Sequence, residues 1–224
     1  MEIPVPVFHA AASGNLNKVR TFFNNNPRIN INTYKNLLFK KSLLLHAAAN
    51  GRINIVRYLV LRGANVNLRD SQGMTPLTSA VWNGRNEVAE YLIDHGADVN
   101  VHVNGLLGAT PMICAIRSPW LSDMEREDFA RALIQSGRLN LNARDTGGRT
   151  AVWWAAREMK LNIFNILLGA GARTNNSVRN AVQNAFRFRN RNNNNNNNNN
   201  NTRRPTVTRS RRRAAVSARP SRAH

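Results

Sequence analysis

The sequence predicts an all-α protein built from stacked pairs of short helices, and two observations carry this prediction. The stretch 70–100, DSQGMTPLTSAVWNGRNEVAEYLIDHGADVN, contains in order the signals of a turn, a helix, a second turn and a second helix. A shift of 33 residues places Gly84 on Gly51 and Gly96 on Gly63 with no gap in between. Recurrence at such a period indicates a repeat architecture, in which neighbouring units share one continuous apolar core.

Local signals define each element of this unit. Asp70 and Gly73 suit the first and last places of a type I turn, which predicts a finger-like connection. Thr75 can cap a helix, and Pro76 fits its first position because the missing N–H is not needed there. Gly84 can end this helix in a left-handed conformation. The second helix carries an apolar stripe of Val88, Ala89, Leu92 and Ile93 and ends at Gly96.

With T-P-L at 75–77 and G-A-D-V-N at 96–100, the unit resembles the ankyrin repeat. The resemblance covers most of residues 5–175 and implies a solenoid of stacked helix-turn-helix units with β-turn fingers. Five repeats are expected within a domain at 1–175. Their approximate bounds are 5–36, 37–69, 70–102, 105–144 and 145–175. A capping helix at 176–191, a poly-Asn linker at 192–201 and a disordered Arg-rich tail at 202–224 are expected to follow.

Several repeats depart from the family pattern. The segment 31–41 is longer than the corresponding loop in the third repeat, which predicts an enlarged finger. In the fourth repeat Pro119 stands where the family has glycine, and 119–128 is expected to be an insertion before the second helix resumes at Phe129. In the fifth, Met159 stands where the family has glycine. The fourth repeat is therefore expected to be the least stable.

Composition limits the class of protein further. The formal net charge of +20 is concentrated at the C-terminal end, because Lys160 onward contains basic residues and no acidic ones. Cys114 is the only cysteine, which excludes an internal disulfide, and its place in a first helix predicts a buried thiol. We expect an intracellular, cytoplasmic monomer, because the chain has no paired cysteines and carries Glu2 where a signal peptide would carry positive charge. No membrane span is expected, since no apolar run reaches the roughly 18 residues that a span requires.

No motif for catalysis or for binding a metal is found in the sequence. None of the five histidines has a second ligand at a spacing typical of a metal site. The acidic run at 123–128 is expected to be a solvated helix start. A phosphate-binding loop and a nucleophile motif are also lacking, so the sequence predicts neither an enzyme nor a cofactor.

The resemblance places partner contacts on the finger tips and the exposed ends of the first helices, and hence predicts binding of another protein. Trp82 is expected either to anchor a partner or to pack on the neighbouring repeat beside the finger at 106–107. Of the adjacent pair Trp153 and Trp154, one is expected to face the core. The candidate residues, matched by register, are Lys41, Asn50, Ser71, Gln72, Met74, Trp82, Asn83, Leu106, Leu107, Arg117, Arg149 and Arg157.

The basic tail supports an alternative function. Dense positive charge on an accessible chain can neutralise phosphates or serve as a nuclear import address read by importin, so the chain could be a nuclear or nucleic-acid-tethered adaptor. Without aromatic residues in this segment, base-specific recognition is not expected. The candidate basic residues of the tail are Arg203, Arg204, Arg209, Arg211, Arg212 and Arg213.

Overall fold

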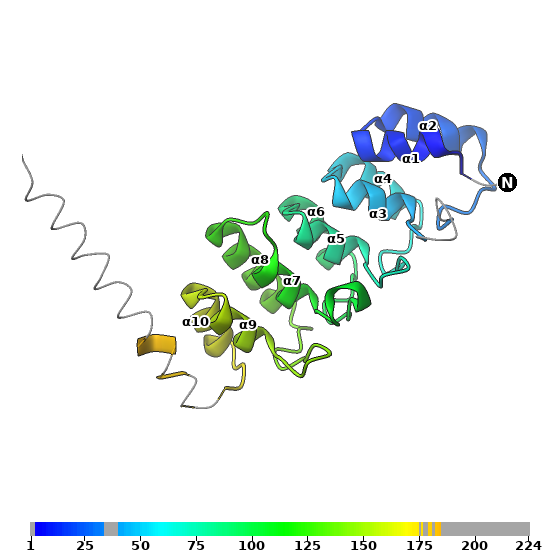
Figure 1. Ribbon diagram of the computed structural model, residues 1–224. Helices are drawn as coiled ribbons and strands as arrows, with labels where there is room; N and C mark the ends of the chain where they lie inside the picture. The colour runs from blue at the N-terminus through cyan, green and yellow to red at the C-terminus, as the bar shows by residue number, and fades with distance from the viewer. Residues whose placement is uncertain (1–2, 34–39, 175, 177–178, 181, 185–224) are drawn as a thin grey trace, which may run out of the picture. The chain divides into compact units, whose positions relative to one another are not determined.

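The computed structural model describes residues 3–33, 40–174, 176, 179–180 and 182–184. In these residues the chain forms consecutive helix pairs joined by turns, and none of them forms a β-strand (Figure 1). The predicted all-α ankyrin-type solenoid is thus confirmed. The helices are α1 (Val5–Ser13), α2 (Leu16–Asn25), α3 (Leu43–Ala49), α4 (Ile53–Leu61), α5 (Pro76–Trp82), α6 (Asn86–Asp94), the 3-10 helix η1 (Asn104–Leu106), α7 (Pro111–Arg117), α8 (Asp123–Gln135), α9 (Ala151–Arg157) and α10 (Leu161–Gly169).

Hydroxyl side chains start most of the first helices. Each accepts a backbone N–H three residues further on, which satisfies a group that the helix itself leaves unpaired. At Thr75 the bond is reciprocal, since Thr78 also accepts the backbone N–H of Thr75. The capping residues of α3, α5, α7, α8 and α9 are Ser42, Thr75, Thr110, Ser122 and Thr150.

The repeats stack in two rows. Each first helix contacts the first helix of the next repeat, from α1 through α3, α5 and α7 to α9, and the second helices from α2 to α10 do the same. The buried side chains form one continuous core along both rows, including Phe8, Leu77, Phe129 and Phe164. Val182, in the segment predicted to be a capping helix, packs against this core, and the described residues of 176–184 are helical.

Asparagine side chains join the loops of neighbouring repeats. In every case a carboxamide oxygen in one repeat accepts a backbone N–H of the next repeat, at a distance of 2.7 or 2.8 Å. We call these four bonds the asparagine ladder. They run from the N–H of Asn65 to Asn32, of Asp98 to Asn67, of Asn140 to Asn100, and of Arg173 to Asn142.

The fourth repeat differs from the sequence-based prediction. The expected insertion at 119–128 is wrong in extent, because α8 already begins at Asp123 and only the residues between Ser118 and Asp123 form the link. Ser122 and Glu125 form a capping box that starts the helix early. Arg126 is buried and donates to the carbonyl of Ser118 at 2.6 Å, which braces the link from inside.

The structure agrees with the sequence analysis at Cys114 and Met159, and it adds a contact at His95. Cys114 is fully buried, and burial raises the pKa of its thiol to about 12. His95 contacts the carbonyl of Tyr91 through Nδ1 at 2.7 Å, at the end of α6. Met159 takes the left-handed conformation expected of a glycine, with φ of 55°. Among the described residues no helix has the length and apolar character needed to cross a bilayer.

Two predicted features fall wholly or partly outside the described residues. The enlarged finger at 31–41 includes 34–39, and the segment 185–224 includes the end of the capping helix, the poly-Asn linker and the Arg-rich tail. They remain predictions from the sequence.

Candidate partner-binding surface

The finger tips of the third, fourth and fifth repeats are joined to one another by hydrogen bonds. The N–H of Gly105 donates to the carbonyl of Gln72 at 2.9 Å. The carbonyl of Leu107 accepts both the N–H of Thr146 at 3.0 Å and its hydroxyl at 2.8 Å. The fingers therefore form a continuous strip, and a partner lying across them meets an ordered backbone.

Most of the candidate residues are accessible, to different degrees. Lys41, Asn50, Ser71, Gln72, Leu107 and Arg157 are exposed. Asn50 and Asn83 each donate to a carbonyl of their own helix, at 2.8 Å. The half-buried members are Met74, Trp82, Asn83, Leu106, Arg117 and Arg149.

Trp82 is partly packed, and its role as an anchor for a partner stays a prediction. Its indole is half-buried and lies against the apolar core, and its carbonyl accepts the hydroxyl of Ser118 at 2.7 Å. Met74, before α5, and Leu106, in the fourth finger, also pack on the core. All three side chains therefore contribute to the packing of the repeats.

The structure brings three of the candidates, Arg117, Arg149 and Arg157, together around two tryptophans of α9. We call these three arginines with Trp153 and Trp154 the Arg–Trp cluster. The two indoles meet edge to face, with centroids 5.1 Å apart. The guanidinium carbon of Arg117 lies 4.1 Å from the centroid of Trp154, and that of Arg157 lies 5.5 Å from that of Trp153. Arg149 lies 4.7 Å from Trp154 and 5.5 Å from Trp153.

Within the pair the two tryptophans differ in burial. Trp154 is 5% exposed and belongs to the core, whereas Trp153 is 38% exposed. The prediction that one indole faces the core is confirmed. Trp153 in the fifth repeat and Leu107 in the fourth finger are therefore exposed apolar side chains that a partner can contact.

A single carboxylate organises the cluster. Asp145 accepts the backbone N–H groups of Gly147 and Arg149 through Oδ1, each at 2.9 Å, as the first residue of the fifth finger. Its Oδ2 accepts the indole N–H of Trp154 and the Nε–H of Arg149, also at 2.9 Å. Burial alone raises the pKa of Asp145, but these hydrogen bonds outweigh it and hold the pKa below its ordinary value.

The role of Asp145 was not foreseen from the sequence, in which it is the first residue of the fifth expected repeat. Asp70, at the same position of the third finger, differs from Asp145 in its side-chain hydrogen bonds. Asp70 also accepts two backbone N–H groups of its own finger, at 2.9 Å, but no side chain among the described residues donates to it. The available signal was Trp154, which follows Asp145 by nine places and the helix cap Thr150 by four.

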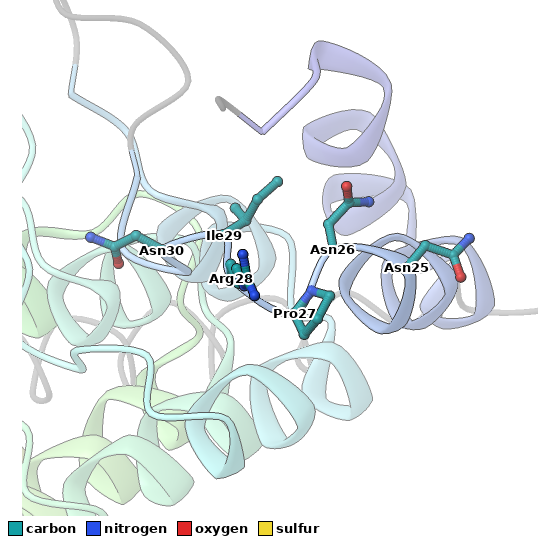
Figure 2. Close-up of a pocket in the computed structure, with 6 residues that line it drawn as sticks. All are labelled: Asn25, Asn26, Pro27, Arg28, Ile29 and Asn30. Atoms are coloured by element: carbon teal, nitrogen blue, oxygen red, sulfur yellow. The ribbon is translucent and has the colours of Figure 1, made fainter.

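A hollow of about 540 Å³ lies elsewhere, at the end of α2 and the loop that follows it (Figure 2). It is lined by Asn25, Asn26, Pro27, Arg28, Ile29 and Asn30. This lining brings three amide groups and one cation together and supplies neither a carboxylate nor a thiol. Over the described residues there is also no group of three or more potential metal ligands.

The comparisons with known proteins agree with the repeat geometry. Residues 7–103 match the family model described as ankyrin repeats (3 copies). Residues 7–103 therefore contain ankyrin repeats, and helix pairs continue beyond the matched residues to α10. No curated protein matches it. Ankyrin repeats are in general non-catalytic modules for protein–protein interaction.

Proposed function

We propose that this protein is a non-catalytic scaffold that binds a partner protein across the fingers and first helices of its last three repeats. The Arg–Trp cluster is the observation that carries the proposal. It combines a partly exposed tryptophan with arginines, the residue types that are most enriched at interface hot spots. The finger strip supplies an ordered edge beside it, so that little conformational entropy is lost on binding.

A site-specific crosslinking experiment tests the proposal. A photoreactive phenylalanine derivative is placed at Trp153 in the full chain, and the same derivative at Trp120 is the control. Trp120 is 69% exposed, lies in the link between α7 and α8, and is not part of the cluster. In an extract of the cells that contain the protein, we expect a defined adduct from position 153 and none from position 120.

The variant Trp153→Ala should then no longer capture the same partner, whereas the variant Trp120→Ala should still capture it. Equal capture by both variants, with both folded by circular dichroism, would place the interface elsewhere and overturn the proposal.

The arginines of the tail favour a second function, in which the chain is a tethered adaptor. The repeats would recruit a protein, while the tail would bind nucleic acid or keep the chain in the nucleus. This role rests on composition, since eight arginines lie between residues 203 and 222. The salt dependence of the affinity distinguishes binding through the tail from binding through the repeats. Binding through several phosphates weakens steeply as the salt concentration rises, whereas a side-chain interface on the repeats changes less.

A further inference from the structure

Two of the three arginines in the Arg–Trp cluster lack a counter-charge. Arg149 is paired with Asp145, with Nε and Oδ2 2.9 Å apart. In the part of the chain that the structure describes, neither Arg117 nor Arg157 has a carboxylate within 4.0 Å or donates a side-chain hydrogen bond. A guanidinium above an aromatic ring interacts through its charge and keeps its N–H donors. These donors are available to a ligand.

Asp145 cannot serve as the missing counter-charge. Both of its oxygens already accept two hydrogen bonds, and its side chain is only 1% exposed. Three guanidinium groups and one carboxylate leave the cluster with a net charge of 3 − 1 = +2.

The chain's own C-terminal segment does not fit the site either. From Lys160 to His224 the sequence contains basic residues and no aspartate or glutamate. This segment would be repelled by the cluster rather than bound to it, so the complementary group must come from another molecule.

We infer that the Arg–Trp cluster receives an acidic segment of the partner protein, with aspartate or glutamate side chains on Arg117 and Arg157 and an apolar side chain on Trp153. A guanidinium presents a planar fork of donors that matches a carboxylate, and such charge-assisted pairs are the strong ones. The apolar side chain would pack on the exposed part of the Trp153 indole. The inference rests on the proposed function.

A nucleic acid would offer phosphates of the same charge, but it fits this surface less well. Single-stranded nucleic acids bind such proteins largely by stacking bases on open aromatic faces. Stacking of successive bases needs several open aromatic rings, and in this cluster Trp153 is partly exposed whereas Trp154 is buried.

Fluorescence polarisation with two labelled probes tests the inference on the full chain. One probe is a short peptide of alternating glutamate and leucine, and the other is a single-stranded oligouridine. The site variant is R117Q/R157Q. The matched control is R57Q/R131Q, which removes two positive charges from exposed arginines on the second helices α4 and α8. Because both variants keep the tail, any binding of the probes to the tail is the same in both.

We expect the site variant to bind the acidic peptide about tenfold more weakly or worse, and the control variant within about twofold of the unmodified protein. A peptide with glutamine in place of glutamate should not distinguish the two variants. Equal affinity of both variants for the acidic peptide, or loss of oligouridine binding alone in the site variant, would overturn the inference.

Failure of the inference can be distinguished from failure of the proposed function. If Trp153→Ala abolishes partner binding while R117Q/R157Q does not, the surface binds a partner whose segment is not acidic, and only the inference fails. If neither change affects the partner, the proposed function fails as well.

Discussion

The indole of Trp154 donates to Oδ2 of Asp145 at 2.9 Å, and both side chains are buried. This bond ties the fifth finger to the first helix of its own repeat. It also fixes the tryptophan on which Arg117 of the preceding repeat lies. The buried carboxylate of Asp145 therefore fixes the position of two members of the Arg–Trp cluster, Trp154 and Arg149.

Changing Asp145 to asparagine should destabilise the protein more than the same change at Asp70. Asparagine can replace Oδ1 as an acceptor in either finger, but at position 145 its N–H₂ group would face the N–H donors of Trp154 and Arg149. An unsatisfied buried group costs about 1 to 3 kcal/mol, which is the expected difference between the two variants. Urea unfolding of both variants measures it, and equal losses would show that the side-chain bonds add no stability.

Stability should fall steeply in acid. Hydrogen bonds lower the pKa of Asp145 against the opposing effect of burial, and the bond from Lys160, 2.6 Å long, is the main cause of the lowered pKa of Asp123. A carboxyl with a lowered folded-state pKa stabilises the fold above its unfolded pKa, about 3.9 for aspartate, and this contribution is lost as the pH falls through the folded-state pKa.

We therefore expect melting temperatures to decrease below about pH 4, and the decrease to be shallower in Asp145→Asn, which lacks one of these groups. Parallel curves for the variant and the unmodified protein would mean that Asp145 does not contribute to the acid sensitivity.

Met159→Gly should stabilise the protein. Met159 has φ of 55°, a conformation that costs a residue with a side chain about 1 kcal/mol or more, and it is not part of the core cluster. The reverse change, Gly96→Ala, should destabilise by a similar amount, because Gly96 has φ of 86° and open space around an added Cβ. Thermal unfolding of both variants gives the comparison, and a loss of stability in Met159→Gly would contradict the backbone argument.

The link in the fourth repeat should open quickly only if its internal brace is removed. Arg126→Met keeps an apolar stem but removes the bonds to the Ser118 carbonyl and to Asp123. We expect faster hydrogen exchange of the amides in the first turns of α8 in this variant, with little change in α6. Unprotected amides at 123–128 in the unmodified protein would show that the brace is ineffective.

Removal of residues 192–224 should leave the melting temperature unchanged. The asparagine run and the arginine segment offer few apolar side chains to bury, whereas Val182, before the cut, already packs on the core. A loss of more than a few degrees would mean that the tail contacts the repeats.

The repeat period and the capping residues were sufficient to predict the fold, because both are encoded locally. Thr75, Pro76 and Gly84 have the roles that their residue types suggest. The sequence analysis placed the acidic run 123–128 at a helix start but began the second helix at Phe129, so the full length of α8 was not predicted. The capping box of Ser122 and Glu125 is a local pattern that marks the true helix start, whereas the contact of Arg126 with the Ser118 carbonyl forms only when α7 and α8 pack.

The candidate surface could be predicted only in part, because it also depends on contacts between repeats. Register placed Arg117 and Arg157 at the ends of first helices and Arg149 in a finger, where the structure has them, but these residues come from two repeats and meet only when the helices stack. The exposure of Trp82 depends on what the next repeat places against it, which no local pattern specifies. Its half-buried position follows from tertiary packing alone.

The asparagine ladder shows what two adjacent repeats must share. Its four bonds join residues 33, 31, 40 and 31 places apart, so the same joint forms even where a repeat carries several extra residues. Additional length is absorbed inside a repeat, and the joint is kept. A whole unit could therefore be duplicated or removed without requiring a new kind of contact, and the length of the surface available to a partner can change in steps of one repeat.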